Sequence, residues 1–232
     1  MHNDSTVPFL DIHTHNSDDE VRGQEIIQIF NVNFTSSEVD LTTLAEHSYS
    51  IGIHPYCIDE LSWQKQLLEL DAILTKFPTI DFIGECGLDK MSSIPIDIQT
   101  QVFVEIIFLS EKHRKPLIIH CVRAHQEILN LKTKIKPTQQ WIIHGFRKNV
   151  QLANQYVVNG VKLSFGKHLI TDENLQHVFA QLPIESIFFE TDDDNNIDIK
   201  NIYAKAASLR NVDLQTLKMH VWSNYRSLLS SL

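Results

Sequence analysis

Residues 9–15 read Phe-Leu-Asp-Ile-His-Thr-His, a short apolar run that leads into two histidines. Similar runs, several of them followed by a histidine or a carboxylate, recur along the chain. The eight runs, rich in Ile, Val and Phe, are Phe9–Ile12, Ile26–Val32, Ser50–Ile53, Phe82–Gly84, Leu117–Ile119, Trp141–Ile143, Val161–Leu163 and Ile187–Phe189. Because they are apolar at successive positions, they are typical of strands buried on both faces, as in a parallel sheet covered by helices.

Stretches with a helical spacing of apolar residues separate these runs. Asp59–Lys76 begins at an aspartate that can cap a helix and stops before Pro78. The other candidates are Asp97–His113, Ala124–Lys134, Lys148–Val158, Glu173–Leu182, Ile199–Leu209 and Asp213–Leu229. Strands that alternate with helices predict an α/β fold, a slightly distorted TIM-type (β/α)8 barrel.

The interval between the first two runs, roughly Asn16 to Glu25, is short and polar. We therefore expect the first barrel helix to be missing or shortened. A complete barrel typically needs ~250 residues, so this shortening agrees with a chain of 232 residues. We expect residues 1–232 to form a single barrel domain.

The chain is acidic, with a formal net charge of −9. A dedicated DNA-binding module needs clustered Lys and Arg, so the acidic composition argues against such a module. The composition is still compatible with a nucleic-acid substrate that is held mainly by metal ions. The cysteines Cys57, Cys86 and Cys121 form no CxxC pair and argue against a disulfide framework. No signal peptide and no membrane-spanning run is visible. We expect a cytoplasmic protein with no membrane association and no obligatory protein partner.

Histidines and carboxylates follow five of the apolar runs. His13 and His15 are two residues apart, so strand alternation directs both to the same side. Four further runs are followed directly by Glu85, His120, His144 and Glu190-Thr191-Asp192. Each residue alone is compatible with a hydrogen-bonded side chain near the core edge. Together they lie at the carboxyl ends of strands, where barrel enzymes build active sites, and they are a ligand set for two divalent cations.

The sequence resembles the TatD-type metal-dependent hydrolases, within the amidohydrolase-like TIM barrels. The matching segments, in order, are Asp11-Ile-His13-Thr-His15, Gly52-Ile-His54-Pro55, Ile83-Gly84-Glu85-Cys-Gly87-Leu88-Asp89, Pro116-Leu-Ile-Ile-His120-Cys-Val-Arg123-Ala124, Ile143-His144-Gly-Phe146 and Glu190-Thr191-Asp192. Asn224 also lies where the family usually carries an asparagine. Any one motif is weak, but the collinear set is specific.

The resemblance implies a role for each ligand candidate. A first metal ion would be held by His13, His15, Glu85 and Asp192, and a second by Glu85, His120 and His144. Glu85 would bridge the two ions, and Asp192 would orient the attacking water and accept its proton. Histidine-rich ligation favours zinc or manganese, and the two carboxylates are compatible with magnesium.

Five residues near the ligands have weaker assignments. His54 and Arg123 are candidate substrate contacts, with a structural turn residue and a helix-start salt bridge as the respective alternatives. Asp89 is expected to support the site by hydrogen bonds. Cys86 and Cys121 flank ligands, but strand alternation turns them away from the site, so we interpret them as packing thiols.

The leading hypothesis is a metal-dependent phosphodiesterase or deoxyribonuclease that cleaves DNA with a metal-activated water. The alternatives are a hydrolase of a small ester, amide or lactone on the same site, and a non-catalytic metal-binding scaffold protein. The sequence departs from the family after Asp192, where Asp193 and Asp194 replace a small residue and a proline and the long family loop is missing. Because such loops meet the substrate, the chemistry transfers better than substrate identity, and the added aspartates would repel a polyanion.

Overall fold

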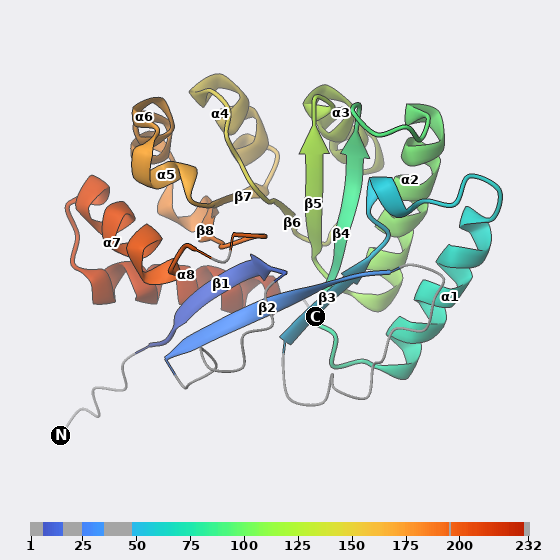
Figure 1. Cartoon of the computed structure of the whole chain (residues 1–232), viewed down its shortest axis with the longest axis horizontal. Coiled ribbons are helices and arrows are strands. Elements are labelled where there is room, and N and C mark those ends of the chain that lie inside the picture. The colour runs from blue at the N-terminus through green and yellow to red at the C-terminus, as the bar shows by residue number, and fades with distance from the viewer. Residues whose placement is uncertain (1–6, 16–24, 35–47, 195, 230–232) are drawn as a thin grey trace.

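Eight strands form one sheet in the computed structural model, which describes residues 7–15, 25–34, 48–194 and 196–229. The strands are β1 (Phe9–Thr14), β2 (Ile26–Asn33), β3 (Ser48–Gly52), β4 (Phe82–Asp89), β5 (Leu117–Val122), β6 (Trp141–Ile143), β7 (Val161–Phe165) and β8 (Ile187–Phe189). Successive strands are parallel neighbours in chain order. A parallel bridge between Thr14 and Asp192 brings the chain after β8 back to β1, so the barrel is nearly closed (Figure 1). The predicted TIM-type barrel is confirmed.

Helices connect the later strands and lie outside the sheet (Figure 1). They are α1 (Trp63–Lys76), α2 (Ile96–His113), α3 (His125–Ile135), α4 (Val150–Val158), α5 (His168–Thr171), α6 (Glu173–Gln181), α7 (Ile199–Arg210) and α8 (Leu214–Leu229), with short 3-10 turns η3 (Pro55–Cys57) and η4 (Ile184–Ser186). None of the helices in the described ranges has the length and apolar character needed to cross a membrane. The predicted shortening of the first helix concerns residues 16–24, which lie outside those ranges.

Several strands are longer than predicted, β4 and β5 most of all. β4 continues to Asp89 and β5 to Val122, so Glu85 and His120 lie within strands instead of directly after them. All of β4 is buried, including the Glu85 carboxylate at its centre. A buried carboxylate is costly unless partners compensate its charge. These partners come from neighbouring strands, and therefore the run of apolar residues alone underestimates the length of β4.

Helix boundaries also differ in places. α1 begins at Trp63 and not at Asp59. Asp59 instead accepts hydrogen bonds from the backbone N–H of Leu61 (3.0 Å) and the hydroxyl of Ser62 (2.5 Å). The aspartate therefore closes the turn before the helix. The short helix α5 was not predicted from the sequence, because its four residues are too few to show a helical period.

Candidate metal centre

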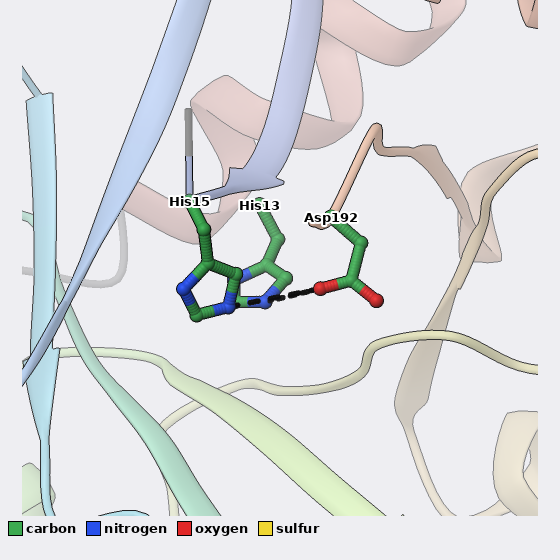
Figure 2. Close-up of side chains that lie close together, drawn as sticks. All are labelled: His13, His15 and Asp192. Atoms are coloured by element: carbon green, nitrogen blue, oxygen red, sulfur yellow. Dashed lines mark ion pairs between the residues drawn. The ribbon is translucent and has the colours of Figure 1, made fainter. Parts of the chain in front are cut away.

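The carboxyl ends of β1, β4, β5, β6 and β8 converge on one cluster of side chains. Four groups of ligand atoms lie within 4.8 Å of one another: His13–His15–Asp192, His13–Glu85–His144, His54–Glu85–His120 and His144–Glu190–Asp192. The structure thus brings all six predicted metal ligands together, and His54 and Glu190 lie in the same cluster. Figure 2 shows the first group, with the two imidazoles and the carboxylate directed toward one another.

Glu85 lies in the middle of this cluster and is 4% exposed. Its Oε2 is 3.4 Å from Nε2 of His15 and 3.6 Å from Nε2 of His13. Its Oε1 is 2.7 Å from Nε2 of His144 and 2.9 Å from Nδ1 of His120. Burial raises the pKa of Glu85, but His144, His120 and His15 outweigh this effect and hold the pKa well below its ordinary value. The carboxylate is therefore ionised, with one oxygen facing each pair of imidazoles.

We call His13, His15 and Asp192 the β1/β8 half of the centre. Oδ1 of Asp192 is 3.4 Å from Nε2 of His13 and 3.7 Å from Nε2 of His15. The Asp192 N–H donates to the His13 carbonyl (3.0 Å), and the His15 N–H donates to the Asp192 carbonyl (2.9 Å). Asp192 has a φ of 56°, which is uncommon for a residue with a side chain. The backbone pairing with β1 holds it in this conformation.

Asp11 fixes the segment that leads to Asp192. This fully buried carboxylate accepts hydrogen bonds from the N–H (3.0 Å) and the hydroxyl (2.6 Å) of Thr191. Burial raises the pKa of Asp11 to about 7, although the hydrogen bonds from Thr191 lower it. Asp11 lies in one of the segments that resemble the family, but the sequence alone predicts no role for it. A lone carboxylate inside the apolar run Phe9–Ile12 was the signal that it has a buried partner.

We call His120 and His144 the β5/β6 half of the centre. Nε2 of His120 is 2.9 Å from Oδ2 of Asp89. Nδ1 of His120 lies at the same distance, 2.9 Å, from Oε1 of Glu85, so a carboxylate faces each ring nitrogen. With a cation at Nδ1, the proton would lie on Nε2 and be donated to Asp89. The structure thus places Asp89 where the predicted support by hydrogen bonding requires it. The Asp89 N–H and carbonyl are in turn bonded to the side chain of Gln99, at 2.8 and 2.9 Å.

Glu190 supports the other imidazole of this half and was missed as a functional residue. It is 1% exposed, and its Oε1 accepts a hydrogen bond of 2.5 Å from the N–H of Gly145 and lies 3.8 Å from Nδ1 of His144. Gly145 has a φ of 58°, which favours glycine. Burial lowers the pKa of His144, but Glu85 and Glu190 outweigh this and raise it well above its ordinary value. The two-residue spacing from Asp192 was the available signal, since it directs both carboxylates to one side.

Buried nitrogens in the cluster test whether it fits a metal ion. Within the described part of the chain, both ring nitrogens of His13 and Nδ1 of His144 are buried without a hydrogen bond. Such groups are rare in folded proteins and need an explanation. A cation next to Nε2 of His13 would provide one. Imidazole nitrogens mixed with carboxylate oxygens are ligands that zinc and other transition ions accept, so the residues present fit divalent metal binding.

His54 and Arg123 lie near the centre in different ways. Nδ1 of His54 accepts a hydrogen bond of 3.2 Å from the Tyr56 N–H, while Nε2 lies 3.5 Å from Oε1 of Glu85. His54 is therefore both a turn residue and a side chain that reaches into the cluster. Arg123 is exposed directly after β5 with a φ of 56°. Among the described residues it makes no ion pair within 4.0 Å, so the alternative of a helix-start salt bridge is not observed there.

The thiols next to the ligands point away from the cluster. Sγ of Cys86 is 3.6 Å from the Ile118 carbonyl, and Sγ of Cys121 is 3.2 Å from Nδ1 of His125. This placement agrees with their interpretation as packing thiols. Asn224 is also remote from the ligands, since its side-chain amide donates to the carbonyls of Ile184 (2.8 Å) and Ile187 (3.1 Å) and so anchors the start of β8.

The chain is similar to several known proteins. YjjV of Escherichia coli (strain K12), named as a metal-dependent hydrolase, is 28% identical over 148 residues. The deoxyribonuclease Tat-D of Schizosaccharomyces pombe is 26% identical over 186 residues, and the 3'-5' ssDNA/RNA exonuclease TatD of Escherichia fergusonii is 25% identical over 147. These alignments cover 62, 73 and 61% of this chain but only 56, 59 and 55% of the three relatives. The chain thus aligns with little more than half the length of each.

Structure and family comparisons agree on the fold and the family. The crystal structure of YjjV superposes with a TM-score of 0.85 at 22% identity, over 97% of this chain and 99% of the other. It therefore shares the barrel fold. The family model described as TatD related DNase matches residues 10–230, which include every residue of the cluster. This chain belongs to the TatD-related DNase family.

Proposed function

We propose that this protein is a metal-dependent phosphodiesterase that cleaves DNA with a metal-activated water. One observation carries the proposal: the buried Glu85 carboxylate lies between two pairs of imidazoles, with one oxygen facing each pair. A carboxylate in this position would offer one oxygen ligand to each of two cations. The names of two relatives, a deoxyribonuclease and an exonuclease, support DNA as the substrate class.

Two divalent cations, zinc or manganese in preference to magnesium, would fit the donor set. The β1/β8 half with Glu85 would hold one of them, and the β5/β6 half with Glu85 the other. When bound, such ions supply Lewis acidity toward a phosphoryl oxygen and lower the pKa of water toward about 7. The protein contributes the rigid placement of the ligands, with Asp89 and Glu190 orienting the imidazoles of His120 and His144.

Asp192 is the general base in this proposal. Its side chain is 38% exposed, so substrate water can reach it. Burial raises the pKa of Asp192, but His13 and His144 outweigh this and lower it below its ordinary value, so the carboxylate is ionised at neutral pH. Oδ1 faces His13, which leaves Oδ2 as the atom that orients the water and takes its proton.

His54 and Arg123 are the proposed substrate contacts. Since Nδ1 of His54 accepts from the Tyr56 N–H, a neutral His54 carries its proton on Nε2. It therefore faces the cluster as a hydrogen-bond donor, suited to a phosphate oxygen and not to a metal ion. Arg123 offers an exposed guanidinium just beyond His120, and its planar fork matches a phosphate group.

Tyr56 supports a nucleotide substrate. Its ring stacks on His54, with centroids 5.5 Å apart and planes at 15°, and the residue is 54% exposed. The phenol therefore lies one ring away from the Glu85 carboxylate, at the edge of the centre. Exposed aromatic rings beside a phosphate site are the usual stacking surface for unpaired bases. If a nucleotide base stacked on Tyr56, the phosphate of that nucleotide would lie near the cluster.

A second candidate is a hydrolase of a small, uncharged ester or lactone. The exposed Asp193 carboxylate next to Asp192 favours it, because this charge would repel a polyanion. Its neighbour Asp194 is compensated by Lys167, at 2.8 Å.

One experiment tests the proposed function. The protein is purified, its metal content is measured by elemental analysis, and it is assayed with zinc, manganese or magnesium on end-labelled single-stranded DNA and on a panel of esters and lactones. We expect metal-dependent DNA cleavage. Turnover of an ester without DNA cleavage would favour the second candidate, and a metal-replete protein inert toward every substrate would indicate a scaffold.

A further inference from the structure

A groove is lined by residues 147–151, at the start of α4, and by residues of α6. These two helices pack against each other and are neighbours in Figure 1. The volume of the groove is about 480 Å³. A smaller recess of about 50 Å³ has Glu190 and Asp192 in its wall. Arg147 and Leu175 line both cavities, so the recess beside the proposed general base and the groove are neighbours that share part of their walls.

The residues between the two cavities have fixed positions. Arg147 is three residues after His144, and Phe146 between them is 2% exposed. The Phe146 N–H donates to the Ser164 carbonyl (2.9 Å), and the Gly145 N–H donates to Glu190 (2.5 Å). The segment that carries the proposed ligand His144 therefore also fixes the position of Arg147 at the start of the groove.

Basic side chains outnumber acidic ones in the groove, although the chain as a whole has a net charge of −9. Arg147 and Lys148 line the groove together with Asp172. The recess is mixed, with Lys167 and His168 beside Glu190, Asp192 and Asp193. Arg147 is 55% exposed and only 3.4 Å from Asp172, and Lys148 is exposed. Exposed ion pairs contribute little free energy, so a phosphate can compete with Asp172 for the guanidinium.

We infer that the α4/α6 groove holds the backbone of single-stranded DNA beyond the phosphodiester that is cleaved, with Arg147 and Lys148 contacting its phosphates. This inference rests on the proposed function. A cavity of this volume holds a drug-sized ligand, which corresponds to a short single-stranded segment and not to a duplex. A duplex would also need a broad basic surface, which the acidic composition does not favour.

The test measures binding of fluorescein-labelled dT8 and dT2 by anisotropy, in the presence of a chelator so that no cleavage occurs. In the double variant Arg147→Ala/Lys148→Ala, we expect the Kd for dT8 to rise about tenfold more than the Kd for dT2. Each phosphate contact contributes about 0.7 to the slope of log K against log salt for single strands, so the slope should fall by about 1.4. The variant Arg147→Lys/Lys148→Arg should restore binding of dT8.

The matched control is Lys65→Ala/Lys134→Ala, which removes two exposed lysines from α1 and α3. An equal loss in this control, an equal loss for dT2 and dT8, or an unchanged Kd would overturn the inference, provided that thermal unfolding shows each variant folded. Absence of dT8 binding by the wild-type protein would also overturn it. Cleavage with added metal is a separate measurement, so bound but uncut DNA would contradict the proposed function and leave the groove supported.

Discussion

The two halves of the metal centre are held in place by different means. In the β5/β6 half a carboxylate lies behind each imidazole: Asp89 is 2.9 Å from Nε2 of His120, and Glu190 is 3.8 Å from Nδ1 of His144, within ion-pair distance but beyond that of a hydrogen bond. In the β1/β8 half His13 is completely buried, and neither of its ring nitrogens makes a hydrogen bond with the described residues. Packing and the backbone pairing with Asp192 position it instead. We therefore expect the β5/β6 half to be the better organised half before metal binds.

Glu85 is the residue that the two halves share, and its loss should have the largest effect. In Glu85→Gln, both halves lose the negative charge between their imidazoles, so metal content should fall in both and DNA cleavage should drop to the detection limit. Elemental analysis and the cleavage assay measure this. Glu60→Gln, which changes an exposed glutamate before α1, serves as the control. Full metal content in Glu85→Gln would show that the carboxylate is not shared.

Asp192 belongs to the β1/β8 half and is the proposed general base, so its loss should affect catalysis more than metal binding. In Asp192→Ala, turnover should fall about 10²- to 10⁴-fold, the usual contribution of a general base. Much of the metal should stay bound, because the four histidines and Glu85 remain. The comparison is made on kcat and on metal content measured in the same preparation, with Asp97→Ala on the first turn of α2 as the control. Equal activity in Asp192→Ala would contradict the assigned role.

Asp89 tests the organisation of the β5/β6 half directly. Removing a carboxylate behind a ligating histidine typically lowers metal affinity about 10- to 100-fold. In the wild-type protein, titration with a chelator should remove metal from the β1/β8 half first. In Asp89→Asn the two steps should move together or change order, and Co2+ spectroscopy can follow them. Retention of the wild-type order and affinity in this variant would mean that packing, and not Asp89, positions His120.

Local sequence predicted the parts of the centre that depend on local geometry. The spacing of His13 and His15 predicted that both rings share one side, and their centroids lie 5.0 Å apart. The alternation of apolar runs with helical stretches predicted the barrel and its parallel strands. The carboxyl ends of parallel strands meet at one face of a barrel. The barrel prediction therefore also implies that residues as distant in sequence as His15 and Asp192 lie close together there.

Features set by partners distant in sequence were not predictable in the same way. β4 can continue past the buried Glu85 because imidazoles from β1, from β5 and from the residue after β6 surround that carboxylate. The function of Glu190 depends on Gly145 and His144, and that of Asp11 on Thr191. No local period encodes these pairs. His54 shows the same limit, since its proximity to Pro55 indicated a turn, whereas its reach toward Glu85 required the fold.

Tyr56 should have a smaller effect, confined to nucleotide substrates. Stacking of a base on an aromatic side chain contributes about 1–3 kcal/mol. At the lower end, Tyr56→Ala should raise KM for single-stranded DNA about fivefold while kcat changes less, and Tyr56→Phe should restore KM. Methyl p-nitrophenyl phosphate, which offers no base, provides the comparison. An equal change in KM for both substrates would indicate that Tyr56 acts by holding His54 and not by stacking.

The smallest effect concerns the two faces of β5, where His120 points into the centre and the next residue, Cys121, points out toward His125. Burial raises the pKa of Cys121 to about 11, although hydrogen bonding from Tyr156 lowers it. At pH 8 the thiolate is then about 0.1% populated, and on this ground a disulfide reagent should react about 200-fold more slowly than with a free cysteine of pKa about 8.5. The rate should rise about tenfold per pH unit toward pH 10, since the thiolate is the reactive form. Cys121→Ser identifies the signal, because Cys57 and Cys86 are also free thiols. If bound metal slowed this reaction, Cys121 would lie on the same face of β5 as His120. The conclusion that one face of β5 holds the metal ligand and the other only packs would then be wrong.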